Sequence, residues 1–162
     1  MSFLRSKKER PSLLRFDRIL VPIMGTEADE PGLRLAALLL GSIGVGEAFL
    51  IHVIEVPFER NLDAEDSKAV AFANEVISRA EGFLGEHGVT VHSGVVQARS
   101  AGPAIVDDAV EQHADLIVMG LRYKKRFGGQ WDAGRTVPYV MRNSTAPVWC
   151  LRVETEELAR TP

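Results

Sequence analysis

Five short apolar runs recur at regular intervals along the chain, and this spacing constrains the fold more than any other feature. They occupy residues 18–23, 48–54, 89–96, 116–119 and 148–153. Their length and their β-branched residues are typical of strands, and the central runs are continuously apolar instead of alternating with polar residues. Continuous apolar character indicates strands that are buried on both faces, as in a parallel sheet.

Helical patterns fill the gaps between the apolar runs. Residues 29–31 have the composition of a helix start, because acidic side chains favour the positive end of the helix dipole and proline is tolerated in the first turn. An amphipathic pattern over 65–87 predicts a long second helix, Ser100 is a candidate N-cap for a third, and a short fourth is expected over about 136–143. Strands and helices therefore alternate strictly, which predicts a sheet with helices on both faces.

The size and composition of the chain are those of one ordinary globular domain. It has 162 residues, of which 46% are hydrophobic and 25% are charged, and these values exclude a wholly disordered chain. A formal net charge of −3 disfavours nucleic acid as a partner. The single cysteine excludes an intramolecular disulfide and fits a reducing cytoplasm. No apolar run reaches the roughly 18 residues of a transmembrane helix.

The folded domain is expected to span residues 16–153, between a basic leader over 1–15 and a polar tail over 154–162. The leader lacks the apolar core and cleavage site of a secretory signal, so we expect a cytoplasmic protein. Its basic side chains leave two interpretations open. The first is a solvated, flexible leader, and the second is peripheral contact with an anionic membrane surface.

The stretch from Gly120 to Thr136 is the strongest candidate for a binding site. In parallel α/β sheets, ligands bind beyond the carboxyl ends of the strands, where this connection is expected to lie. At about 14 residues it is long, since such connections usually have roughly 2–6. Gly134 precedes the expected fourth helix, whose free N–H groups favour anions, and Thr136 can cap that helix or donate to a phosphate oxygen. The alternative interpretation is a flexible loop with solvated charges.

Cationic side chains make this stretch positive although the chain is acidic overall. Four of the five residues from Arg122 to Arg126 are basic, and Arg135 adds a further cation. Because guanidinium groups bind phosphate oxygens in a bidentate manner, the stretch predicts a phosphorylated ligand.

Four segments resemble the universal stress protein family: residues 16–22, 51–54, 114–120 and 144–148. The resemblance covers about residues 16–153. It implies a three-layer α/β/α fold with a five-stranded parallel sheet in the strand order 3-2-1-4-5. It also implies a homodimer and, in one branch of the family, a site for ATP or AMP.

That branch of the family carries a glycine motif, in which two residues separate the first and second glycines and nine separate the second and third. A serine or threonine follows. Gly120 matches the first glycine and Gly134 the third, but Tyr123 stands at the second position and the loop is one residue longer. Arg135 replaces the hydroxyl residue, with Thr136 directly after it. Tyrosine at position 123 blocks the close backbone approach that a glycine would permit.

Three positions outside the motif also bear on the expected site. Met24 stands where ATP-binding members usually have an aspartate that faces the adenine, and loss of that acceptor is expected to cost about 1–3 kcal/mol. Val53 matches the position whose backbone contacts the base, and Arg99, at the end of the third strand, replaces a more usual glycine and is expected to point toward the crevice. The expected ligand-binding residues are Val53, Arg99, Met119, Gly120, Arg122, Lys124, Arg126, Gly134, Arg135 and Thr136.

These features predict a universal stress-type regulatory domain in stress signalling that binds a phosphorylated small molecule. ATP or AMP is one candidate, and a cyclic nucleotide or cyclic dinucleotide is as credible. We expect no catalytic residue and no metal ligand, because no acid–base pair, histidine spacing or activated nucleophile stands out. Two alternatives remain: slow ATP hydrolysis, and an adaptor with an empty site that regulates a partner such as a membrane transporter.

The remaining expectations concern the last strand and three isolated residues. In the strand order that the resemblance implies, residues 148–153 form an edge strand. We expect this strand to pair with its copy in a homodimer, unless the tail over 154–162 covers it. His52 is expected to be a core histidine and Cys150 a buried, inert thiol. Trp131 either packs as a lid or stacks on a base or partner.

Overall fold

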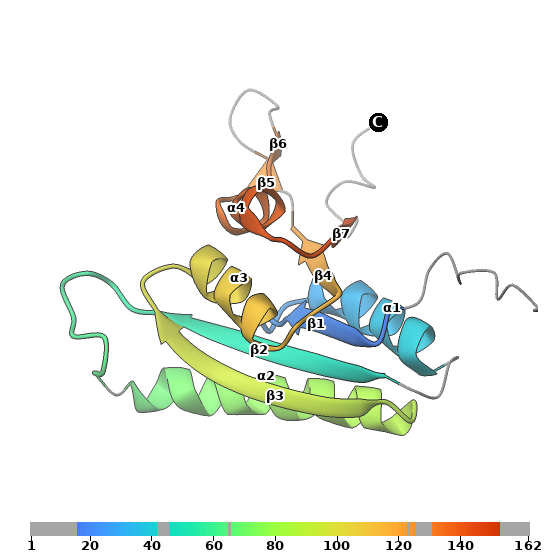
Figure 1. The fold of residues 1–162 in the computed structure, drawn as a ribbon. Coiled ribbons are helices and arrows are strands. Elements are labelled where there is room, and N and C mark those ends of the chain that lie inside the picture. The colour runs from blue at the N-terminus through green and yellow to red at the C-terminus, as the bar shows by residue number, and fades with distance from the viewer. Residues whose placement is uncertain (1–15, 42–45, 65, 123, 126–130, 153–162) are drawn as a thin grey trace, which may run out of the picture.

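The computed structural model describes residues 16–41, 46–64, 66–122, 124–125 and 131–152. At its centre lies a five-stranded parallel sheet in the order β3-β2-β1-β4-β7, as Figure 1 shows. Its strands are β1 (Arg18–Pro22), β2 (Glu47–Glu55), β3 (Thr90–Ala98), β4 (Leu116–Leu121) and β7 (Val148–Arg152). Because β7 is the fifth strand of this sheet along the chain, the expected order 3-2-1-4-5 is confirmed.

Four helices cover the two faces of the sheet. They are α1 (Asp29–Gly41), α2 (Ser67–Glu86), α3 (Ala101–Glu111) and α4 (Thr136–Asn143). Buried side chains of α1 and α2 join one hydrophobic cluster, and those of α3 and α4 join a second cluster. The protein is therefore a three-layer α/β/α sandwich, with α2 and α3 on opposite sides of the sheet in Figure 1.

The two clusters divide the side chains of the central strands by simple alternation. In β4, Leu116 and Val118 belong to the cluster under α1 and α2, whereas Ile117 and Met119 belong to the cluster under α3 and α4. Every residue of β4 is buried. This is why the run is continuously apolar: successive side chains point to opposite faces, and both faces are covered.

The start of α2 shows how local sequence determines a helix boundary. Asp66 is the N-cap, and its carboxylate accepts a hydrogen bond from the Ala69 amide at 3.1 Å. This bond, with the nearby Arg60 guanidinium, lowers the pKa of Asp66. The helix therefore begins at Ser67, two residues later than the amphipathic pattern predicts, and ends at Glu86.

The helices α3 and α4 begin where expected, but their caps differ from the expected ones. Ser100 occupies the N-cap position of α3, but its side chain makes no capping hydrogen bond. The Glu55 carboxylate instead accepts from the Ala101 amide at 2.7 Å. At α4 the N-cap residue is Arg135, and Thr136 is the first residue of the helix. Thr136 is therefore not the cap of α4.

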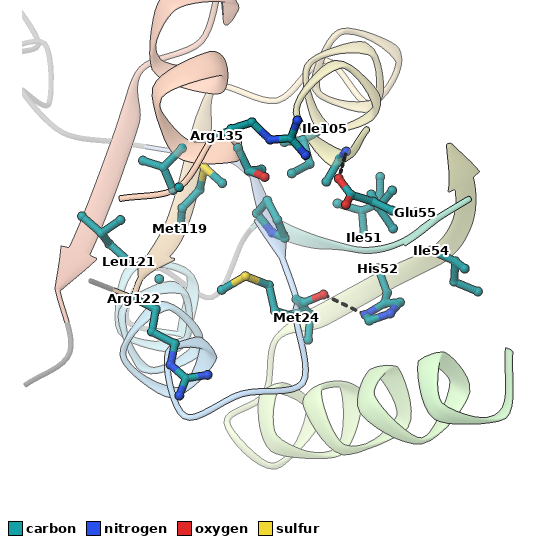
Figure 2. Close-up of a pocket in the computed structure, with 18 of the residues that line it drawn as sticks. Met24, Ile51, His52, Ile54, Glu55, Ile105, Met119, Leu121, Arg122 and Arg135 are labelled. Carbon is teal, nitrogen blue, oxygen red and sulfur yellow. Dashed lines mark hydrogen bonds between the residues drawn. The ribbon is translucent and has the colours of Figure 1, made fainter. Parts of the chain in front are cut away.

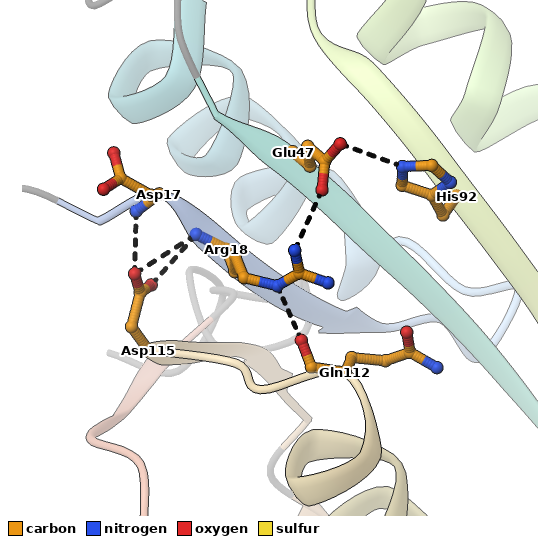
Figure 3. A network of polar contacts seen from close by, with 6 residues as sticks. All are labelled: Asp17, Arg18, Glu47, His92, Gln112 and Asp115. Carbon is orange, nitrogen blue, oxygen red and sulfur yellow. Dashed lines mark hydrogen bonds and ion pairs between the residues drawn. The ribbon is translucent and has the colours of Figure 1, made fainter.

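A polar network lies where β1, β2 and β3 begin. Figure 3 shows its residues: Asp17, Arg18, Glu47, His92, Gln112 and Asp115. The Asp115 carboxylate accepts from the Asp17 amide at 2.8 Å, and Arg18 donates from Nε to the Gln112 carbonyl at 2.7 Å. Glu47 pairs with both Arg18 and His92. The network ties together the amino ends of the strands.

A small second sheet lies within the long connection after β4. It pairs β5 (Lys124–Lys125) antiparallel with β6 (Trp131–Asp132). The sequence analysis predicted no strands within this connection, so these four residues are an addition that the structure reveals. None of the helices in the described part of the chain has the length and apolar content needed to cross a bilayer.

Candidate ligand-binding site

A cavity of about 530 Å³ opens at the carboxyl ends of β1, β2 and β4 (Figure 2). The loop after β1, the last residues of β2 and β4, and the first turns of α3 and α4 contribute its walls. This is the edge of the sheet at which the sequence predicted a site. Its volume lies within the roughly 300–1,000 Å³ typical of small-molecule sites.

One wall of the cavity is apolar. Ile51, Val53, Ile105, Met119 and Leu121 all line it, from strands and from α3. Val53 and Met119 were expected there from the sequence. An apolar wall of this kind suits the face of an aromatic ring more than a charged group, since burial of apolar surface is favourable and burial of an unpaired charge is costly.

The two motif glycines are required for different reasons. Gly120 is buried, and a Cβ added to it would lie 1.8 Å from the carbonyl oxygen of Ala28. Glycine therefore lets the turn before α1 approach β4. Gly134 has a φ of +73°, while a Cβ there would meet no atom within 4 Å. Its backbone conformation, and not a lack of space, favours glycine.

Cationic side chains reach the cavity from two elements. Arg122, just after β4, is exposed and pairs with Glu27 through Nε and Oε1 at 3.3 Å. Arg135, at the start of α4, is also exposed and lines the cavity with Gly134 and Thr136. In Figure 2 the two arginines lie on different sides of the cavity. The positive end of α4 adds to this charge.

Two expected cations remain predictions. The backbone of Lys124 belongs to β5, but its side chain is not described. Arg126 and the motif position Tyr123 lie outside the described residues.

The structure places Arg99 beside the cavity and not in its wall, which differs from the sequence expectation. Its Nη1 donates to the carbonyl oxygens of Val56, Pro57 and Arg60 in the β2–α2 connection. Its guanidinium carbon also lies 5.3 Å from the centroid of the Phe58 ring. Arg99 therefore fastens this connection to the end of β3.

His52 is buried, as expected, with 7% of its surface exposed. Its Nδ1 lies 2.8 Å from the Ile23 carbonyl oxygen, and its ring meets Phe72 edge-on. The ring also contributes to the cavity wall. The structure thus gives His52 a structural role at the border of the site.

A buried carboxylate holds the loop that carries Met24. Asp29 accepts hydrogen bonds from the amides of Met24, Gly25 and Thr26, the shortest being 2.6 Å. Burial raises the pKa of Asp29, although these bonds oppose the shift. Met24 itself is 44% exposed and lines the cavity.

Glu55 is a cavity residue that the sequence reasoning missed. It is the last residue of β2, and its side chain lines the cavity. The signal available was its position, since a polar residue that ends a central strand projects at the ligand-binding edge. Within the described residues, no cluster of three or more metal-ligating side chains is present.

Fold and cavity together define an α/β sandwich with a ligand-sized cavity at the carboxyl edge of a parallel sheet. The model of the universal stress protein family matches residues 15–152. The chain therefore belongs to the universal stress protein family.

Solved structures with the same fold include two of universal stress proteins from Archaeoglobus fulgidus. One has 24% identity and a TM-score of 0.68, covering 82% of this chain and 96% of its own. The other, in complex with dAMP, has 22% identity and a TM-score of 0.67, covering 85% and 98%. A universal stress protein in complex with cAMP has 16% identity and a TM-score of 0.65, covering 86% and 98%. Comparison with curated proteins gives no match.

Proposed function

We propose that this protein is a non-catalytic regulatory domain that binds a nucleotide in the cavity. The observation that carries the proposal is the combination, in one cavity, of an apolar wall and a cationic side at the start of α4. A nucleotide has the matching parts, namely an aromatic base and a phosphate. Solved relatives in complex with dAMP and with cAMP support the same ligand class.

The base would pack on the apolar wall beside Met24, Val53 and Met119. The phosphate would lie at the start of α4, where the positive end of the helix dipole and the Arg135 guanidinium favour an anion. Arg122 approaches from the other side, with part of its charge offset by Glu27. The Met24 thioether is only a weak acceptor for an adenine amino group, so this site would select the base weakly.

Calorimetry with ATP, AMP, cyclic AMP and cyclic di-AMP tests the proposal. We expect micromolar binding of at least one of the four, and no heat from any of them would contradict nucleotide binding. A phosphate-release assay with ATP tests the absence of catalysis. Turnover well above a protein-free blank, lost when Gly134 is replaced, would show that the protein is an ATPase.

Arg135 is expected to contribute strongly to nucleotide affinity. Replacing it with alanine removes a charge-assisted hydrogen bond to phosphate, so we expect the Kd to rise about tenfold. Arg142 provides the matched control, because it is an exposed arginine in the last turn of the same helix and does not line the cavity. Equal affinities of Arg135→Ala and Arg142→Ala would place the phosphate elsewhere.

An adaptor that binds no nucleotide is the second candidate, and Met24 is the observation that favours it. This exposed thioether, a weak acceptor, stands at the position where ATP-binding members of the family usually have an aspartate. Such an adaptor would regulate a protein partner, for example a membrane transporter. If calorimetry detects no binding of any of the four nucleotides, the adaptor is favoured over the nucleotide-binding regulatory domain.

We further propose a homodimer through β7. Among the residues that the structure describes, this strand is at the edge of the sheet and pairs with β4 alone. The Ile117 amide of β4 donates to the Pro147 carbonyl at 2.9 Å. Along β7, the backbone N–H and C=O groups of successive residues therefore point alternately to β4 and to the open edge. The amide of Leu151 therefore points to β4, and that of Cys150 points to the open edge. Antiparallel pairing of two open edges gives a closed two-fold dimer.

Cys150→Pro is the variant that tests this dimer. It removes a backbone amide that points to the open edge and leaves the hydrogen bonds between β7 and β4 intact. We therefore expect monomers with a native circular dichroism spectrum. Leu151→Pro is the control, because it breaks the ladder inside each subunit and should lower the unfolding midpoint. Sedimentation decides: a wild-type protein that is monomeric across micromolar concentrations would exclude the dimer.

A further inference from the structure

Two helices begin at the cavity, and their starts differ in charge. Ala101, Gly134, Arg135 and Thr136, at or just before the starts of α3 and α4, all line it. The first turn of an isolated helix favours anions, because its N–H groups lack partners within the helix. At α4 the N-cap residue Arg135 adds a positive charge and makes no side-chain capping bond. At α3, a side chain of the protein itself already accepts a hydrogen bond from a backbone amide at the start of the helix.

That side chain is Glu55. Its Oε1 accepts from the Ala101 amide at 2.7 Å, and Figure 2 shows the carboxyl group at the start of α3. Among the described residues that line the cavity, Glu55 is the one with a carboxyl group. The side chain is exposed, so a ligand in the cavity can reach it.

The bond to Ala101 leaves Glu55 able to accept more hydrogen bonds. An ionised carboxylate offers about four acceptor sites and no donor. It therefore attracts a hydroxyl or amino hydrogen of a ligand and repels a second phosphate. The cavity thus offers an acceptor at the start of α3 and cations at Arg122 and Arg135.

We propose that Glu55 determines ligand specificity by accepting a hydrogen bond from a sugar hydroxyl and by excluding a second phosphate group. The ligand is then a ribonucleotide with phosphate at one end only. This inference rests on the proposed nucleotide binding. It assigns opposite roles to the two helix starts: α4 attracts the phosphate, and α3, occupied by Glu55, contacts the sugar.

Glu55→Gln tests the inference with little disturbance of the fold. The amide oxygen can still accept from Ala101, while the negative charge is lost and an N–H donor faces the cavity. Glu59→Gln is the matched control, since Glu59 is an exposed acid of the β2–α2 connection that does not line the cavity. Calorimetry would compare AMP, its 2′-deoxy and 3′-deoxy forms, and adenosine 3′,5′-bisphosphate.

We expect the wild type to bind AMP about fivefold to tenfold more tightly than at least one deoxy form, and to bind the bisphosphate poorly. Glu55→Gln should reduce the preference over the deoxy form to within about twofold and tighten the bisphosphate about tenfold. Glu59→Gln should match the wild type. If AMP binds but Glu55→Gln keeps the wild-type ratios, the role of Glu55 is refuted and the nucleotide site stands. If no nucleotide binds the wild type, both proposals fail.

Discussion

Replacing Gly120 with alanine is expected to destabilise the protein by about 4 kcal/mol or more, or to prevent folding. The new Cβ would lie 1.8 Å from the Ala28 carbonyl oxygen and 2.5 Å from its carbon. Both are backbone atoms of the turn that leads into α1, so no side-chain rotation relieves the overlap. Relief requires β4 and this turn to separate, which opens the buried carboxyl edge of the sheet. Overpacking that side chains can absorb typically costs only about 1–3 kcal/mol.

Urea denaturation measures this effect, and Gly82→Ala is the control. Gly82 lies inside α2, and a Cβ there would meet no atom within 4 Å. Alanine at that position should stabilise the protein by roughly 0.5–1 kcal/mol, because glycine inside a helix carries an entropic cost. The same substitution thus has opposite expected signs at the two sites. If Gly120→Ala were as stable as the wild type, this result would contradict the close approach of Ala28 to β4.

The arrangement of strands and helices could be predicted because the apolar pattern of each segment matches the faces that the fold buries. A parallel strand that is covered on both faces needs apolar residues without interruption, and this is visible in the runs of β1, β2 and β4. The helices show their apolar stripes in the same way. The short pairing of β5 with β6 was missed, because two-residue strands are too short to show alternation.

The site was predictable where it depends on the edge of the sheet, and not where it depends on tertiary contacts. Val53, Met119 and Gly120 lie within the last three residues of β2 or β4, and Gly134 to Thr136 lead into α4, so topology alone brings them together. Arg99 directly follows β3, but its long side chain reaches carbonyl groups of the β2–α2 connection instead. No sequence pattern reports which acceptors such a side chain will find.

Gly120 illustrates a further limit of motif reasoning. The motif assigns this glycine to a phosphate site, whereas the structure shows a packing requirement against Ala28. Both requirements can hold at one position. Packing against Ala28 would require glycine at position 120 even in a protein that binds no nucleotide. Gly120 alone is therefore weak support for nucleotide binding. Arg135 and the apolar wall support it more directly.

Asp29→Ala is expected to lower the free energy of unfolding by about 2–4 kcal/mol. The carboxylate accepts from the amides of Met24, Gly25 and Thr26, and it is only 7% exposed. Alanine leaves these donors without their acceptor. Because the same loop carries Met24 into the cavity, nucleotide affinity should fall together with stability. Glu30→Ala is the control: this neighbouring acid is exposed and pairs only with Arg34 among the contacts described, so its loss should cost less than about 0.5 kcal/mol.

Asp29 should also leave a signature in the pH dependence of stability. Burial, the largest cause, raises its pKa above the ordinary value of 3.8, so the folded protein holds this proton more tightly than the unfolded chain does. The corresponding stabilisation is complete below pH 3.8 and is lost as the pH rises through the raised pKa. Asp29→Asn cannot ionise, so this part of the pH dependence should be absent from its urea denaturation series between about pH 4 and pH 7. A variant whose pH dependence matches that of the wild type would contradict the raised pKa of Asp29. The hydrogen bonds to the loop would still be tested separately by Asp29→Ala.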